Sequence, residues 1–272
     1  MRRFTWFNAT ALTLGFAFLY LPMIILITYS FNESKLVTVW AGFSTKWYGE
    51  LLGNESFLDA AWVTVQVAVV SSTIATVLGT MAALVLVRAG RFAGRTLFSG
   101  MIYAPLVMPE VITGLSLLLL FIGIGLDRGI LTIILAHTTF SMCFVSVVVS
   151  SRLVSFDRSL EEAALDLGCT PFHAFRLVTL PIIAPAVISG WLLAFTLSLD
   201  DLVIASFTAG PSATTLPIKI FSAVRLGVSP EINALSTIMI AIVTVGVVAA
   251  SLISKRASLA QQRDTQAAAR AA

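Results

Sequence analysis

The sequence has little charge for its length. Charged residues make up 11% of the 272 residues, whereas hydrophobic residues make up 58%, and the mean hydropathy is +0.96. A soluble globular domain carries about 25% charged and about 45–50% apolar residues. The composition therefore excludes an ordinary soluble domain and predicts an integral membrane protein.

Cysteine and histidine are scarce. Cys143 lies in an apolar run and Cys169 in a polar loop, while His137 and His173 lie in different segments. Neither their number nor their spacing suits a disulfide framework or a zinc site, so we expect no bound metal. The basic residues are spread over several loops, so the net charge of +3 does not indicate a nucleic-acid partner.

The chain also lacks a G-x4-G-K-[ST] phosphate-binding loop and any internal repeat at a fixed period. Without that loop the chain itself is not expected to hydrolyse ATP, so no cofactor is expected in it.

Long apolar runs, in contrast, are abundant. A membrane-spanning helix needs about 20 mostly apolar residues. Six stretches meet this length, residues 10–31, 62–87, 97–123, 129–150, 182–207 and 233–254. We therefore expect an all-α membrane protein in which six transmembrane helices, surrounded by the lipid bilayer, form a single domain over residues 1–272.

The third of these stretches, 97–123, is longer than a straight spanning helix needs. It carries Pro105 and Pro109 one turn apart, and each proline removes a backbone hydrogen bond. We expect this span to be kinked or broken there.

The basic residues predict the orientation in the membrane, because Lys and Arg of short loops collect on the cytoplasmic side. With the N-terminus inside, 12 of the 17 basic residues fall on the cytoplasmic side. This places both termini, the loop 151–181 and the polar tail 255–272 in the cytoplasm.

The loop 151–181 has the pattern of two short helices. Ser159 and Glu162 have the capping-box spacing that begins a helix. Gly168 can end that helix in a left-handed conformation, and a second short helix is expected from Pro171 to Val178. The loop therefore predicts a helix–turn–helix that projects from the membrane.

The same loop resembles a known family. It matches the pattern E-A-A-x3-G-x9-[IV]-x-L-P of the permease subunits of binding-protein-dependent, type I ABC importers. The matching residues are Glu162, Ala163, Ala164, Gly168, Val178, Leu180 and Pro181. The resemblance implies the permease fold of these importers and a coupling helix, beginning at Pro171, that docks into a partner ATPase subunit.

In this family Gly168 would act as the hinge of the coupling helix, and Phe172 and Phe175 would fill the cleft of the partner. The resemblance implies that ATP and Mg are bound by two partner ATP-binding subunits rather than by this chain.

A narrower resemblance extends over nearly the whole chain. Stretches such as "APLVMPEVITGLSLLLLF" and "FTLSLDDLVIASFTAGPSATTLP" are similar to polyamine permeases, most of all to the second permease subunit of putrescine importers. It implies a multi-pass protein of the bacterial inner membrane that works with a different permease subunit and a periplasmic polyamine-binding protein. Putrescine and spermidine both remain open as substrates.

Three acids, Glu110, Asp200 and Asp201, lie inside the predicted spans. Intramembrane acids usually face a cavity, a partner or a substrate. Putrescine is an alkyl chain with an ammonium group at each end, so a path for it needs acids. We expect Glu110 and Asp200 at two levels of one path, although Glu110 has the alternative role of accepting hydrogen bonds from amides freed by Pro109.

Helical spacing separates the two neighbouring aspartates. Ser189, Thr196 and Asp200 share one stripe of the fifth span, whereas Asp201 shares a stripe of small residues suited to close helix packing. We therefore expect Asp200 to face the path with Ser189 and Thr196, and Asp201 to serve a helix contact.

Two other classes of membrane protein also use intramembrane acids. An ion-coupled secondary transporter is one, but it needs no importer signature and typically shows inverted repeats. An intramembrane aspartyl protease is the other, but it needs two aspartates that face each other. Asp200 and Asp201 are adjacent on one segment, which excludes such a dyad.

Overall fold

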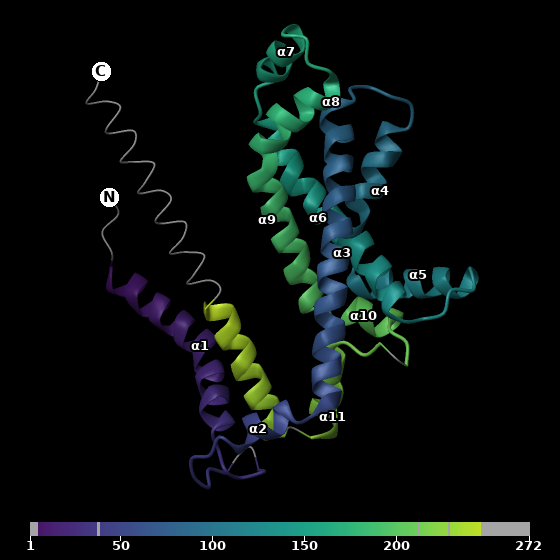
Figure 1. Cartoon of the computed structure of the whole chain (residues 1–272). Coiled ribbons are helices and arrows are strands. Elements are labelled where there is room, and N and C mark those ends of the chain that lie inside the picture. The colour runs from purple at the N-terminus through teal and green to yellow at the C-terminus, as the bar shows by residue number, and fades with distance from the viewer. Residues whose placement is uncertain (1–4, 37–38, 212, 228, 246–272) are drawn as a thin grey trace. The chain divides into compact units, whose positions relative to one another are not determined.

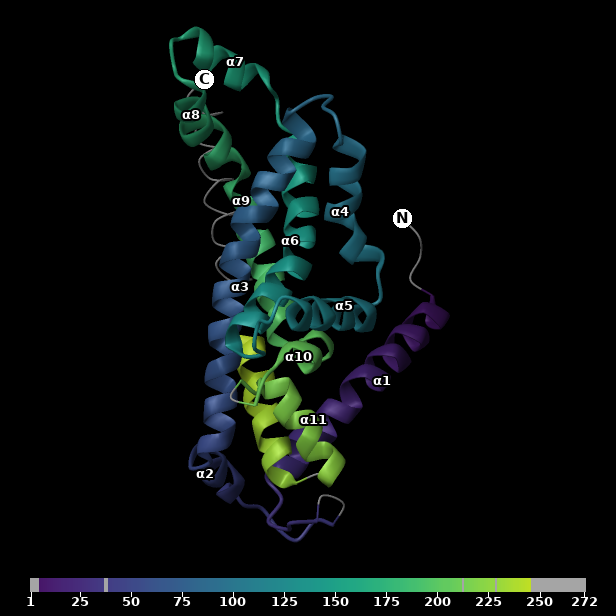
Figure 2. The ribbon, with the colours of Figure 1, turned by 90° about the vertical axis from the view of Figure 1, so that its right-hand side faces the viewer.

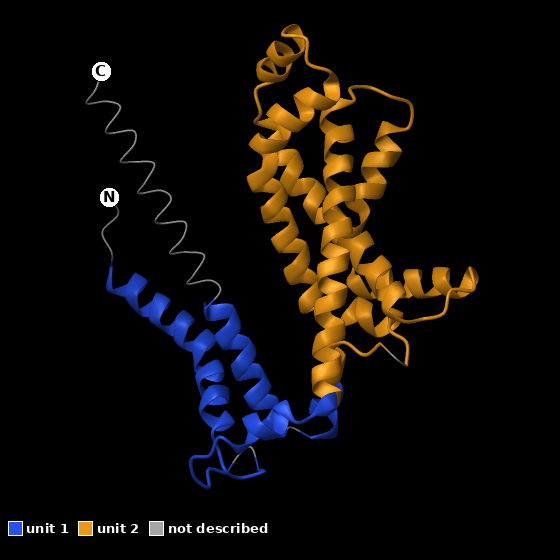
Figure 3. Ribbon diagram, viewed as in Figure 1, with its two compact units in different colours: residues 1–55, 222–272 blue, residues 56–221 orange. Residues whose placement is uncertain are grey.

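The computed structural model describes residues 5–36, 39–211, 213–227 and 229–245. In these ranges the apolar runs fold into helices, and most of the polar segments between them form loops. Contacts group the chain into two compact units, Met1–Glu55 with Ser222–Ala272, and Ser56–Phe221 (Figure 3). The first unit contains α1 (Trp6–Ser30), α2 (Lys46–Leu52) and the apolar helix Pro230–Val245 (Figure 1). The prediction of a single domain stays a prediction.

The second unit holds the remaining elements, except that the first residue of α3 and the last residues of α11 belong to the first unit. These elements are α3 (Glu55–Arg88), α4 (Arg95–Val107), α5 (Glu110–Gly123), α6 (Ile130–Val154), α7 (Ser159–Asp166), α8 (Pro171–Ala174), the π-helix η1 (Phe175–Thr179), α9 (Leu180–Leu199), α10 (Val203–Thr208) and α11 (Leu216–Leu226).

Four described helical segments are long and apolar enough to cross a membrane, and a fifth span results if α4 and α5 count as one. The four are Trp6–Ser30, Glu55–Arg88, Ile130–Val154 and Pro171–Leu199. They correspond to the predicted spans 10–31, 62–87, 129–150 and most of 182–207. The predicted sixth span, 233–254, begins within Pro230–Val245 and continues outside the described residues, where the tail 255–272 also lies.

The core of the second unit forms where α3, α6 and α9 cross. Val145 of α6 is fully buried between small residues of the other two helices. A Cβ added to Gly79 of α3 would lie 2.8 Å from the Val145 side chain, and one added to Gly190 of α9 would lie 3.2 Å from it. Small residues let helix backbones approach closely, which is how helices pack without a hydrophobic drive in lipid.

The predicted kink in the third span is confirmed. α4 ends at Val107, α5 begins at Glu110, and the two axes differ by 118°. Pro105 lies inside α4, so the break forms at Pro109, whose ring cannot continue the helix. Figure 2 shows α5 lying crosswise below α4.

The predicted fifth span, 182–207, is not one continuous helix. α9 ends at Leu199 and α10 begins at Val203, so Asp200 and Asp201 lie in a short break between them. The Asp201 carboxylate accepts hydrogen bonds from backbone N–H groups of α10. An aspartate that bonds to the backbone in this way competes with a continuing helix, which is why hydropathy alone missed the break.

The loop 151–181 forms the predicted helix–turn–helix with two differences. The cap of α7 comes from Asp157, whose Oδ1 accepts from the Ser159 N–H at 3.0 Å, and not from the Ser159 side chain. This hydrogen bond holds the pKa of Asp157 below its ordinary value. The second helix does not end at Val178, because α8 continues through η1 directly into α9. In Figures 1 and 2, α7 projects beyond the end of α3, and α8 lies at the level of that end.

Candidate functional site

The two broken spans meet through their second halves. α10 packs against α5 and α6. A Cβ added to Gly114 of α5 would lie 2.7 Å from the Phe207 ring and 3.3 Å from the Ile204 Cα, so only glycine fits at this crossing. The breaks at Pro109 and at Asp200–Asp201 are therefore followed by two helices in direct contact. Discontinuous helices of this kind form substrate sites in secondary transporters.

Both carboxylate oxygens of Asp201 accept hydrogen bonds. Oδ1 accepts from the Ile204 N–H at 3.3 Å, and Oδ2 accepts from the Ala205 N–H at 2.7 Å. Oδ2 also lies 3.0 Å from Nε2 of His137, in a close contact between two side chains that are 9% and 2% exposed. The helical-stripe argument does not apply to Asp201, because the residue lies outside both helices.

His137 is the residue that the sequence analysis passed over. Its Nδ1 lies 2.7 Å from the hydroxyl oxygen of Ser198 in the last turn of α9, and this hydroxyl accepts from Ser71 of α3 at 3.2 Å. A histidine in an apolar span carries the same desolvation cost that drew attention to the acids. That signal would have found it.

Asp200 differs from its neighbour in being exposed. It follows the last residue of α9, and its backbone N–H donates to Thr196 O at 3.3 Å. Among the residues that the structure describes, its carboxylate makes no hydrogen bond or ion pair with another side chain. The hydroxyls of Thr196 and Ser189, also exposed, donate to the Leu192 and Pro185 carbonyls of their own helix.

Glu110 is the first residue of α5 and is also exposed. In the described ranges its carboxylate accepts no hydrogen bond from the break beside it, so the alternative role at freed amides has no contact to support it. The structure does not bring Glu110 into contact with Asp200.

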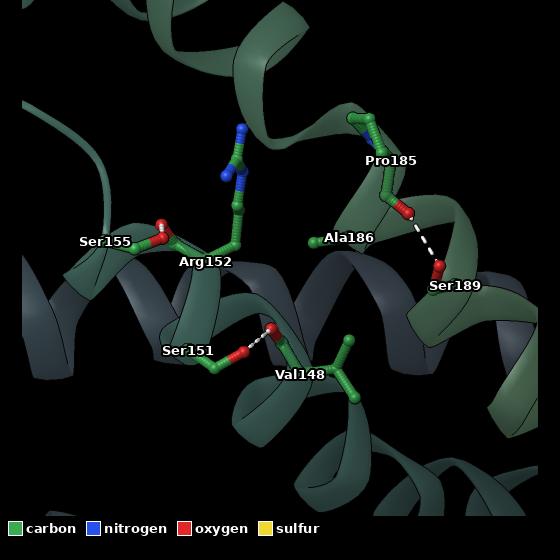
Figure 4. A pocket seen from close by; sticks show the side chains of 7 residues that line it. All are labelled: Val148, Ser151, Arg152, Ser155, Pro185, Ala186 and Ser189. Carbon is green, nitrogen blue, oxygen red and sulfur yellow. Dashed lines mark hydrogen bonds between the residues drawn. The ribbon is translucent and has the colours of Figure 1, made fainter. Parts of the chain in front are cut away.

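Ser189 lines a pocket of about 460 Å³ between α6 and α9 (Figure 4). Arg152 enters this pocket, and its Nε donates to Ile182 O at 3.4 Å. The other residues that line the pocket are Val148, Ser151, Ser155, Pro185 and Ala186. The guanidinium repels other cations, so this pocket is unsuited to hold an ammonium group.

The residues of the coupling motif lie on one hairpin. Gly168 has φ +89°, the left-handed conformation predicted for it, and Thr170 caps α8 by accepting from the His173 N–H at 3.4 Å. The remaining motif residues are Glu162, Ala163 and Ala164 in α7, Pro171 and Phe172 in α8, Phe175 in η1, and Leu180 and Pro181 at the start of α9. Phe172 is 69% exposed, whereas Phe175 is half-buried.

Glu161, just before the motif, ties the hairpin to the rest of the unit. Its Oε2 lies 3.3 Å from the guanidinium of Arg88 at the end of α3, and its Oε1 accepts from the Thr179 hydroxyl. The guanidinium in turn lies 5.0 Å from the centre of the Phe156 ring. Sequence spacing gave no signal for these contacts, because they join segments far apart in the chain.

We expect Glu161→Leu to loosen α7 against α3 and η1. The substitution removes a partly exposed ion pair and a hydrogen bond worth about 1–2 kcal/mol together, so trypsin should cut at Arg158 about fivefold or more faster. Limited proteolysis of membrane vesicles measures this rate. Asp166→Asn, an exposed change in the same helix, is the control, and equal cutting rates for both variants would show that the Glu161 contacts hold nothing in place.

No group of three or more His, Cys, Asp or Glu side chains in the described part of the chain is arranged to hold a metal ion. The site thus consists of two helix breaks, a buried polar network and an exposed hairpin.

Comparison with known proteins identifies the family. Residues 75–258 match the model of the binding-protein-dependent transport system inner membrane component. The chain is 59% identical to the putrescine transport system permease protein PotI of Escherichia coli (strain K12), over 95% of this chain and 94% of that protein. It is 46% identical to the spermidine/putrescine transport system permease protein PotC of the same strain, over 90% and 92%.

A solved structure shows the same fold. One chain of a bacterial ABC transporter that imports the acidic polysaccharide alginate superposes with a TM-score of 0.72, covering 92% of this chain and 99% of its own, at 17% identity. The helical architecture, the family match and the similarity to these permeases agree, and the chain belongs to the family of binding-protein-dependent transport system inner membrane components.

Proposed function

We propose that the chain is one of two different permease subunits of an ATP-driven importer that moves putrescine from the periplasm to the cytoplasm across the bacterial inner membrane. The observation that carries this proposal is the 59% identity to a putrescine permease along nearly the full length of both chains. The lower identity of 46% to a spermidine/putrescine permease makes spermidine the second candidate substrate.

The proposed topology has six spans with both termini in the cytoplasm. The distribution of basic residues supports this orientation. The helix Pro230–Val245 supports a sixth span that continues through residue 254.

The proposed partners include two ATP-binding subunits, which would hold ATP and Mg, and a periplasmic polyamine-binding protein. Support for the ATPase contact comes from the hairpin of α7 and α8, which projects from the unit and carries an exposed aromatic residue, Phe172. An exposed aromatic residue on a short helix is suited to a groove in a partner protein.

The proposed substrate path runs past Asp200, with Thr196 along α9 and with Glu110 at the other break. Ser189 lies on the same helix beside Arg152, so on this path it contacts the substrate without binding an ammonium group. An exposed carboxylate without a side-chain partner, as at Asp200, is free to pair with an ammonium group. Asp201 is not free in this sense, because His137 and two backbone N–H groups occupy its oxygens. We therefore assign Asp201 a supporting role beside the path.

The test is uptake of labelled putrescine by proteoliposomes that contain the complete complex. We expect uptake that requires ATP and the binding protein, and competition by unlabelled putrescine at lower concentration than by spermidine. Stronger competition by spermidine would change the assigned substrate. Uptake driven by an ion gradient without ATP would instead support the secondary-transporter alternative.

A further inference from the structure

One imidazole contacts both sides of the break between α9 and α10. Nδ1 of His137 lies 2.7 Å from the Ser198 hydroxyl, in the last turn of α9. Nε2 lies 3.0 Å from Oδ2 of Asp201, the carboxylate that caps α10. His137 itself lies in the first half of α6, so a single side chain from a third helix bridges the two helix ends.

The network that contains His137 can satisfy each of its hydroxyl groups. Ser71 donates to Ser198, and the Ser198 hydroxyl can in turn donate to Nδ1 of His137. Ser71, Ser198 and His137 are at most 3% exposed. Polar groups buried this deeply are costly when unpaired, so the network holds its members in one arrangement.

α10 depends on contacts of this kind because it has only six residues, too few to be stable alone. At its far end, the Thr132 hydroxyl of α6 lies 2.8 Å from Thr208 O. α6 therefore holds α10 near both ends, through Thr132 and through His137. Asp200 lies between Ser198 and Asp201, and its carboxylate has no such contact with any side chain in the described ranges.

We propose that His137 is a positioning residue, which fixes the geometry of the break by bridging Ser198 and Asp201 and thereby sets where the Asp200 carboxylate lies on the transport path. The first part of this proposal is independent of the substrate, whereas the second part rests on the proposed function of Asp200.

Two amide substitutions separate the contacts of the imidazole. The Gln side chain can place its amide nitrogen near the position of Nε2, so His137→Gln keeps a donor for Asp201. The shorter Asn side chain reaches only the region of Nδ1, so His137→Asn keeps the Ser198 contact and leaves Asp201 without its partner. Thr139→Val, on the same helix, is the matched control, because that hydroxyl bonds only to Leu135 O of its own helix.

The first measurement is hydrogen–deuterium exchange of the assembled complex in nanodiscs, followed in peptides that cover residues 203–206. The amides of Ile204 and Ala205 donate to Asp201. We expect these amides to exchange roughly tenfold or more faster in His137→Asn, because an interaction with a charged carboxylate changes an equilibrium constant by about this factor. In His137→Gln and Thr139→Val the exchange rate should be near that of the wild type. Unchanged exchange in His137→Asn would overturn the bridge.

The second measurement is ATP-driven putrescine uptake for His137→Asn, Asp200→Asn and the double variant. If His137 acts through Asp200, the double variant should transport about as well as the weaker single variant, because the second change removes nothing further. Losses that multiply would mean that His137 does not act through Asp200. A purely structural role of His137 would give that multiplied result.

The two measurements test separate parts of the proposal, the bridge at the helix break and the effect on transport. If the wild-type complex does not transport putrescine, the proposed substrate is wrong, yet the exchange experiment still decides whether the bridge exists. If His137→Asn does not assemble, His137→Gln decides alone, and fast exchange of residues 203–206 in that assembled variant would overturn the bridge.

Discussion

Gly168→Pro should abolish ATP-driven uptake while leaving the chain in the membrane. Gly168 has φ +89° and its N–H donates to Leu165 O at 2.9 Å, whereas proline fixes φ at about −65° and has no N–H. The turn between α7 and α8 would have to change, and α8 would no longer present Phe172 in the same direction. Uptake into proteoliposomes and co-purification with the ATPase subunits measure the two effects.

A second variant tests the same surface without changing the turn. Phe172→Asp places a charge where a docked apolar ring is proposed, and should reduce co-purification of the ATPase by about tenfold or more. Asp166→Asn, exposed on the neighbouring helix, should behave as wild type. Normal uptake by both Gly168→Pro and Phe172→Asp would contradict the coupling role of the hairpin.

Asp200→Asn should lower putrescine uptake roughly ten- to a hundredfold while the complex still assembles. The change keeps size and hydrogen bonding but removes the charge, and a hydrogen bond to a charged group is worth about 1.5–3 kcal/mol. Assembly should survive because the carboxylate makes no hydrogen bond or ion pair with another side chain in the described part of the chain. Labelled putrescine uptake, normalised to the complex recovered, measures the effect.

Asp201→Asn is the comparison for this prediction. It should reduce the yield of assembled complex more than the turnover of what assembles, because it removes the charge beside His137 and one of two capping oxygens. Wild-type uptake by Asp200→Asn together with failed uptake by assembled Asp201→Asn would reverse the two assignments.

Features set by neighbouring residues were predictable from the sequence. The break at Pro109 follows from the missing N–H of proline, and the turn at Gly168 follows from the ease with which glycine adopts positive φ. The start of α8 at Pro171 follows the preference of proline for the first turn of a helix. Each of these depends on local backbone chemistry.

Features set by packing were not predictable in the same way. The break at Asp200–Asp201 interrupts a run that is otherwise apolar, and the contact that accompanies it comes from His137, 61 residues before Ser198. The ion pair between Glu161 and Arg88 likewise joins different helices. The amino-acid sequence indicates that burying such groups is costly, but it does not identify the partner residue that offsets the cost.

The helical connection from α8 to α9 has a mechanical consequence. Pro171–Leu199 is one helical segment of 29 residues, about 43 Å long at about 1.5 Å per residue. Within it, the π-helical turn η1 changes the number of residues per turn, so it fixes the angle about the axis between Phe172 at one end and Ser189 further along. No loop separates α8, η1 and α9. A rotation of α8 about the helix axis would therefore be transmitted along α9 to its last turn, beside Asp200.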